Sequence, residues 1–119
     1  MGVVEAGAEA VVGEGAGEAL PHPPVEALEL PAVLHALSDP MRLRIVAALA
    51  DGQELSCRSI DLPIVKSTST HHFRVLREAG VIRQRVESTA KLSSLRREDL
   101  DARWPGLLDA VLAGLVSTA

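Results

Sequence analysis

The chain has 119 residues, of which 47% are hydrophobic and 24% charged, and this size fits one domain. Only 2% of the residues are aromatic, which argues against a platform for stacking unpaired bases, and a single cysteine excludes an internal disulfide. The formal net charge of −4 conceals a basic block, since residues 58–97 carry nine Lys and Arg against three acids. Such a block is a candidate surface for polyanions such as nucleic acid.

The first 24 residues are predicted to form a disordered tail. Gly, Ala, Val and Glu follow one another there without a helical or strand period, and the segment ends in prolines. It has neither a positively charged start nor a long apolar run, so we expect no secretory signal and no membrane span. The sequence therefore predicts a cytoplasmic protein whose folded domain spans residues 25–119.

Two helices are predicted after the tail. Leucine and valine recur near helical spacing over residues 28–37. A second helix is expected over about residues 40–50, because Asp39 can cap its first turn and Pro40 suits its first position. Asp51 and Gly52 indicate that this helix ends before them.

The remaining elements alternate between helix and hairpin. We expect a short third helix, a fourth helix that ends at Gly80, two strands joined by a turn, and a last helix; these cover about residues 54–61, 66–79, 81–86, 90–95 and 104–116. A helix-turn-helix followed by a hairpin is the order of a winged helix-turn-helix, a mainly α fold with a small β-hairpin.

The fourth helix has two different sides. At about 100° per residue, Ser69, Phe73 and Leu76 share the side expected to face the core. The opposite side carries donors and acceptors that suit base edges and phosphates, namely Ser67, His71 and Arg74 with Thr70 beside them. A solvated polar face explains this helix equally well by itself, but the basic hairpin that follows favours DNA binding.

Two segments resemble the ArsR/SmtB family of bacterial transcriptional repressors. They are residues 36–45, ALSDPMRLRI, and residues 67–82, STSTHHFRVLREAGVI, and the resemblance extends over about residues 30–116. It implies a homodimer formed by the first and last helices. Such a dimer would bind an inverted-repeat operator in double-stranded DNA, and family members often release the operator when a metal or an oxidant binds.

The resemblance also implies which residues contact DNA. The recognition-helix positions are Lys66, Ser67, Thr68, Thr70, His71 and Arg74, and the wing positions are Arg83, Arg85 and Lys91. His72 matches a family position that usually points partly inward, so the resemblance implies a structural residue. His71 and His72 are adjacent and point about 100° apart on a helix, so they cannot easily share a metal.

The chain departs from the family pattern at three places. Val65 stands where the family has a capping Ser, and Ser69 replaces an aliphatic residue, so the recognition helix is expected to be looser or to begin later with Ser67 as its cap. The wing turn lacks its usual Gly, which leaves its shape open.

The family's effector sites are incomplete in this chain. Cys57 lies where the family has a metalloid site, but Ser56 replaces its first cysteine, so an ordinary buried thiol is favoured over a single-thiol sensor. The last helix contains no histidine. His22 and His35 remain as candidate ligands for nickel, zinc or cobalt, against the simpler interpretation that both are solvated or interfacial.

The leading hypothesis is a dimeric, sequence-specific regulator of transcription. The alternative is a degenerate winged helix that acts through a protein co-regulator, which would supply the missing sensing site. An enzyme is not expected, because the sequence offers no plausible carboxylate pair, no nucleophile with a base and no phosphate-binding glycine loop.

Overall fold

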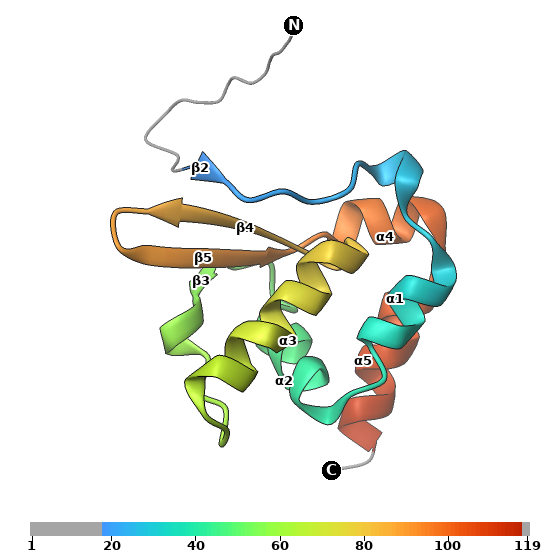
Figure 1. The fold of residues 1–119 in the computed structure, drawn as a ribbon. Coiled ribbons are helices and arrows are strands. Elements are labelled where there is room, and N and C mark those ends of the chain that lie inside the picture. Colours follow the sequence, from blue (N-terminus) through green and yellow to red (C-terminus); the bar gives the residue numbers. More distant parts are fainter. Residues whose placement is uncertain (1–17, 118–119) are drawn as a thin grey trace, which may run out of the picture.

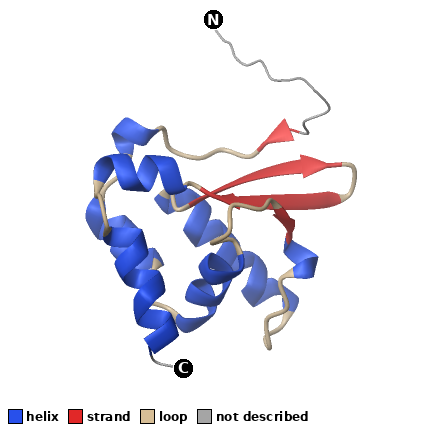
Figure 2. Ribbon diagram, turned by 180° about the vertical axis from the view of Figure 1, so that it is seen from behind, coloured by secondary structure: helices blue, strands red, loops and turns tan. Residues whose placement is uncertain are grey.

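The computed structural model describes residues 18–117. In chain order its elements are β2 (Glu18–Ala19), the 3-10 helix η1 (Val25–Ala27), α1 (Leu30–Ala36), α2 (Pro40–Ala48), β3 (Leu55–Ser56), the 3-10 helix η2 (Cys57–Ser59), α3 (Lys66–Ala79), β4 (Ile82–Glu87), β5 (Ala90–Leu95), α4 (Arg97–Arg103) and α5 (Leu107–Ser117). Helices gather beside a small sheet whose long hairpin projects to one side (Figures 1 and 2). The predicted mainly α fold with a β-hairpin is confirmed.

The core lies where α3 packs against α1, α2 and β4. Each of these elements contributes a fully buried aliphatic side chain: Val33 from α1, Ile45 from α2, Leu76 from α3 and Ile82 from β4. Burial of one such side chain stabilises the fold by roughly 1.5–3 kcal/mol. The core thus fixes α3 relative to the hairpin.

The sheet has the order β2-β4-β5-β3 with antiparallel pairing throughout. The β4–β5 hairpin pairs Ile82 with Leu95 at its base and Glu87 with Ala90 at its tip. In the turn, Ser88 has φ 59°, the left-handed conformation that glycine adopts without strain. In this turn, a serine therefore adopts the left-handed conformation that glycine usually adopts.

The prediction of a disordered tail up to residue 24 is wrong for residues 18–24. Glu18 and Ala19 pair with Val86 and Arg85 of β4. Pro21 and Pro23 have no N–H to donate, but their carbonyl groups accept hydrogen bonds from arginines that lie far away in the sequence. Composition could not reveal these long-range partners. Residues 1–17 lie outside the described residues.

The predicted third helix is replaced by β3 and η2. Leu55 and Ser56 pair with β5, and the Ser56 hydroxyl accepts a hydrogen bond from the N–H of Ser59 at 3.3 Å. A serine that bonds its own local backbone favours a turn over an α-helix, and a segment this short has little helical stability of its own.

The predicted last helix begins too early. Residues 97–103 form α4, which the sequence analysis missed although Glu98 and Asp99 in its first turn complement the helix dipole. Pro105 and Gly106, with φ 87° at the glycine, then separate α4 from α5. None of the helices in residues 18–117 is long and apolar enough to cross a membrane.

Candidate nucleic-acid interface

Helix α3 begins at Lys66 and ends at Ala79, as predicted. Gly80 ends it in the left-handed conformation at φ 88°. The N-cap residue is Val65, and no side chain caps the helix there. The suggestion that the helix begins later, with Ser67 as its cap, is therefore wrong, while Ser69 lies half-buried on the predicted core side.

The two sides of α3 differ as the helical spacing predicts. His72, Phe73 and Leu76 are buried. The residues that the sequence analysis assigned to recognition are all exposed: Lys66, Ser67, Thr68, Thr70, His71 and Arg74. These side chains offer two positive charges, three hydroxyls and one imidazole on a single helix, which suits contacts with phosphates and base edges.

A buried arginine ties α3 to the rest of the domain. Arg42 of α2 donates to the carbonyl of Ala36 at 2.8 Å and to that of His35 at 3.3 Å, and its Nη1 lies 3.0 Å from Nδ1 of His72. The same imidazole has its Nε2 3.9 Å from the carboxylate of Asp39. His72 is thus structural, and Arg42 is the supporting residue that sequence reasoning missed.

Asp39 performs the predicted capping of α2. Its carboxylate accepts hydrogen bonds from the N–H groups of Met41 at 2.8 Å and Arg42 at 3.2 Å. Burial opposes ionisation of this group, but the two N–H donors and the nearby positive charge together lower the pKa of Asp39. The ionised carboxylate therefore contributes to the rigid platform under α3.

Two of the three predicted wing contacts already have partners. Arg83 pairs with Asp99 at 3.0 Å. Arg85 donates to both carboxylate oxygens of Glu54 at 2.8 Å and also lies 3.2 Å from Glu87. The hydrogen bonds from Arg85 lower the pKa of Glu54, so this ion pair persists well below neutral pH.

Lys91 differs from the two wing arginines. It is exposed, and within the described part of the chain it takes part in no salt bridge. Its full charge therefore stays available to a phosphate, whereas the charges of Arg83 and Arg85 are partly neutralised inside the protein.

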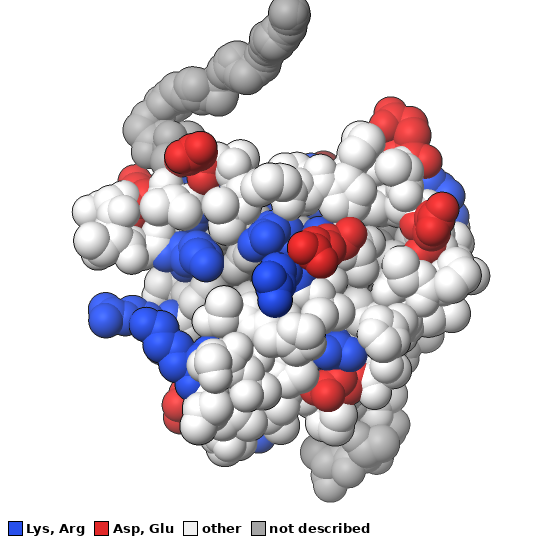
Figure 3. Space-filling model, in the orientation of Figure 1, with Lys and Arg blue, Asp and Glu red and all other residues white. Residues whose placement is uncertain are grey.

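The exposed groups share one side of the molecule. The tip of the β4–β5 hairpin and the first turn of α3 both lie on the left in Figure 1, opposite α1 and α5 on the right. Lys and Arg side chains gather at the centre and left of this face, with single acidic side chains between and around them (Figure 3). A single docked duplex could meet both the helix and the hairpin there.

A second polar network connects the hairpin with α3. Gln84 is 2% exposed, and its amide nitrogen lies 3.1 Å from Oγ of Ser93 and 3.5 Å from Sγ of Cys57. The amide oxygen accepts a hydrogen bond from Arg77 of α3 at 2.7 Å. The half-buried Cys57 therefore occupies a structural contact between η2 and the sheet.

The candidate metal ligands do not form a cluster. Nδ1 of His22 lies 3.0 Å from the carbonyl oxygen of Leu20, and His35 is exposed on α1. Among residues 18–117, no three His, Cys, Asp or Glu side chains lie close enough together to hold a metal ion. Nickel, zinc or cobalt binding stays a prediction.

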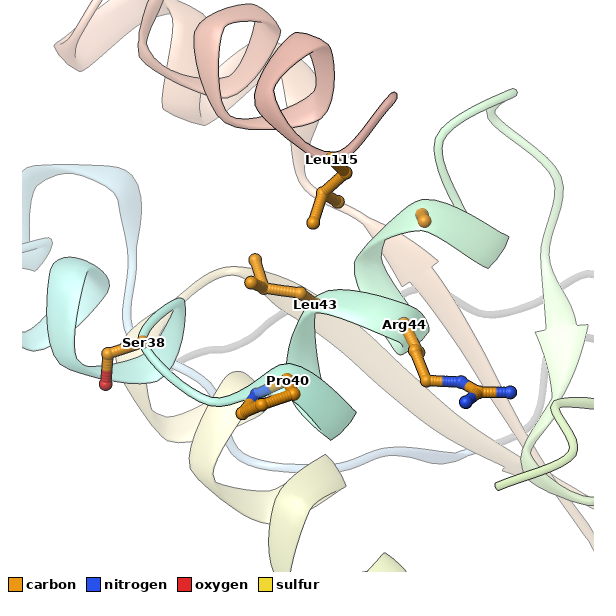
Figure 4. Close-up of a pocket in the computed structure, with 6 residues that line it drawn as sticks. Ser38, Pro40, Leu43, Arg44 and Leu115 are labelled. Atoms are coloured by element: carbon orange, nitrogen blue, oxygen red, sulfur yellow. The ribbon is translucent and has the colours of Figure 1, made fainter. Parts of the chain in front are cut away.

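An open pocket lies between α2 and α5, away from the exposed side of α3. Its volume is about 320 Å³, and Leu43 and Leu115 face each other across it (Figure 4). The other lining residues are Ser38, Pro40, Arg44 and Ala47. This mainly apolar lining does not add to the candidate DNA-binding surface.

Comparisons with known proteins agree with this geometry. Residues 37–85 match the model of the helix-turn-helix domain. The HTH-type transcriptional regulator YceK of Bacillus subtilis is 40% identical over 82 residues, which cover 66% of this chain and 82% of YceK. An HTH-type transcriptional regulator of Methanocaldococcus jannaschii is 37% identical over 59 residues, 48% of this chain and 66% of that protein.

Two crystal structures share the fold. One is a "possible transcriptional regulator for arsenical resistance", with a TM-score of 0.55, 28% identity and coverage of 76% of this chain and 98% of the other. The second is an ArsR family transcriptional regulator, with a TM-score of 0.57, 20% identity and coverage of 75% and 93%. Both similarities extend over most of the described domain.

Proposed function

The chain belongs to the ArsR-type winged helix-turn-helix regulators of transcription, and on that premise we propose that it binds an inverted-repeat operator in double-stranded DNA as a homodimer. Each subunit would place α3 in a major groove and the β4–β5 hairpin beside it. Half-sites would then be about 10 bp apart, one helical turn. The observation that carries the proposal is the exposure of every polar recognition position on α3 while the opposite side is buried.

The proposed base-reading residues are His71 and Arg74. Both are exposed in the middle of α3, and Arg74 takes part in no salt bridge within the described chain. Lys66, Ser67, Thr68 and Thr70 lie in the first half of the helix and supply further contacts to bases and phosphates. Lys91 is proposed to bind phosphate, with Arg83 and Arg85 in weaker roles because of their internal partners.

Exposed leucines on α1 support the proposed dimer. Leu30 and Leu34 are 37% and 46% exposed, and their spacing of four residues puts them on one side of the helix. A second copy of the chain would bury this apolar side together with α5, whose Ala110 and Ala113 are exposed. Replacement of Leu34 by Glu is expected to shift the protein toward a monomer in light scattering after size exclusion.

The experiment that tests the function starts with selection of DNA from a random pool by the purified full chain. Fluorescence anisotropy then compares the selected operator with a scrambled duplex. His71→Ala and Arg74→Ala are expected to weaken operator binding by about 1–3 kcal/mol and scrambled-DNA binding by less. Equal losses on both duplexes would contradict their role as base readers.

Two control variants make the comparison sharper. Lys91→Ala should weaken binding to both duplexes alike, and it should reduce the slope of log affinity against log salt by roughly 0.9. Arg44→Ala removes an exposed arginine on α2 and should change neither the affinity for the two duplexes nor the salt slope. If the purified protein selects no DNA sequence, the alternative of a winged helix that acts through a protein co-regulator takes precedence.

A metal effector finds little support in the geometry of one subunit. Among residues 18–117, no third ligand lies near His22 or His35, so a nickel, zinc or cobalt site built from the described residues would need ligands from a second copy. Isothermal titration with the three metals, on the full chain and on His22→Ala and His35→Ala variants, tests this. Unchanged heats in the variants would exclude both histidines.

A further inference from the structure

Val65 combines two unfavourable features at the start of the recognition helix. It is 67% exposed, more than any other large hydrophobic residue in the described part of the chain. It is also the N-cap of α3, where it provides no side-chain acceptor for the free N–H groups of the first turn. A serine, threonine, asparagine or aspartate would satisfy one of those groups and would not expose an isopropyl group to water.

The surroundings of Val65 are polar and positively charged. Lys66, Ser67 and Thr68 follow it directly, and all three are exposed. The start of α3 lies on the same side of the molecule as the hairpin tip (Figure 1). An apolar protein partner would have to desolvate this lysine and the hydroxyls, whereas DNA would pair with them. The neighbours of Val65 therefore favour DNA as the group that covers it.

The major groove of DNA presents one apolar group to a protein, the C5-methyl group of thymine. We propose that Val65 packs against this methyl group and thereby selects a thymine in each operator half-site. This inference rests on the proposed function and names a specificity-determining residue for it. The missing helix cap is then explained, because serine, asparagine and aspartate lack the apolar surface that contacts the methyl group, and threonine offers one methyl group where valine offers two.

The test combines one protein variant with one change in the DNA. Val65→Ser removes the apolar contact and supplies a helix cap, so the variant should unfold at a higher temperature than the wild type and yet bind the selected operator more weakly. Deoxyuridine in place of thymine removes only the methyl group. At one thymine of a single half-site this replacement should weaken wild-type binding about fourfold, the factor that corresponds to about 0.8 kcal/mol for a buried methyl group, and in both half-sites about fifteenfold.

The decisive measurement is the coupling between the two changes. With Val65→Ser, deoxyuridine at that position should have no effect, and selection from a random pool by the variant should lose the preference for thymine there. If every thymine replacement affects wild type and variant equally, or if the selected operators contain no constant thymine, Val65 does not read thymine and the inference is wrong while the proposed DNA binding stands. If the wild type selects no DNA sequence, both fail.

Discussion

Nη1 of Arg42 lies 3.0 Å from Nδ1 of His72, although the two residues are 30 positions apart in the chain. Both residues are buried, with exposures of 7% and 8%. The contact connects α2 with the inner side of α3, so the outward presentation of His71 and Arg74 depends on a polar contact within the domain.

Replacement of Arg42 by Met should destabilise the domain by about 2–4 kcal/mol, because methionine fills part of the space but leaves buried acceptors without donors. The acceptors concerned are the carbonyl group of Ala36 and Nδ1 of His72, whereas the carbonyl group of His35 keeps its hydrogen bonds from Ser38. Urea unfolding measures the change. Arg44→Met, at an exposed position of the same helix, is the matched control and should stay within about 0.5 kcal/mol of the wild type.

Replacement of Asp39 by Ala should cost about 1 kcal/mol at pH 7, because the first turn of α2 loses its cap. The pKa of Asp39 is lowered in the folded protein, so its charge stabilises the fold above the unfolded value near 3.8 and this contribution is lost as the pH falls through the lower folded value. The difference in unfolding free energy between wild type and variant should therefore become smaller below about pH 4, but a part should remain, because the protonated carboxyl group still offers a carbonyl oxygen to the first turn.

Asp39→Asn separates the cap from the charge. Asparagine keeps a side-chain oxygen for the N–H groups of Met41 and Arg42 but cannot ionise. This variant should keep most of the stability at pH 7 and lose the acid-dependent part. A difference between wild type and Asp39→Ala that stays constant down to pH 3 would show that the charge contributes nothing.

Replacement of Glu54 by Gln should tighten non-specific DNA binding, because Arg85 then keeps only Glu87 as an acidic partner and more of its charge is available to phosphate. The slope of log affinity against log salt should steepen by up to roughly 0.9, the value for one additional phosphate contact. Glu26→Gln removes an exposed acid on η1 and serves as the control for the change in net charge. Equal effects of both variants would mean that the ion pair with Glu54 does not reduce the binding of Arg85 to phosphate.

Replacement of Ser88 by Gly should stabilise the domain by about 0.5–1 kcal/mol. The left-handed conformation at φ 59° is strained for serine, and this strain energy exceeds the additional entropic free energy that ordering a glycine requires. Thr89→Gly in the same turn is the control and should be neutral or destabilising, since Thr89 does not have a positive φ. Thermal unfolding compares the variants, and a loss of stability in Ser88→Gly would contradict the argument.

Removal of residues 1–24 should lower stability more than removal of residues 1–17. The longer deletion takes away β2 and the carbonyl groups of Pro21 and Pro23, which accept hydrogen bonds from Arg77 at 3.0 Å and Arg96 at 2.6 Å. The shorter one leaves these contacts intact. Midpoints of urea unfolding that shift equally for both deletions would show that β2 adds no stability.

The elements with local signals could be predicted from the sequence. Asp39 with Pro40 defined the start of α2, Gly80 defined the end of α3, and the apolar spacing of Phe73 and Leu76 identified the buried side of the recognition helix. Caps and helical periods act between residues a few positions apart, so one chain is enough to recognise them.

The features that depend on distant partners were missed. β3 forms because Leu55 and Ser56 pair with β5, and β2 forms because Glu18 and Ala19 pair with β4. The wing arginines looked free in the sequence, but the fold brings Glu54 to Arg85 from 31 positions away. No local pattern contains these pairings, since tertiary packing decides them.

The two-residue strands at either side of the hairpin have a consequence for the protein at high concentration. β2 covers part of the outer edge of β4, and β3 covers part of the outer edge of β5. A bare hairpin would present two rows of unpaired backbone groups, on which another chain can build a strand and start aggregation. The short segments at Glu18–Ala19 and Leu55–Ser56 interrupt both rows, so the hairpin is protected against self-association through its edges.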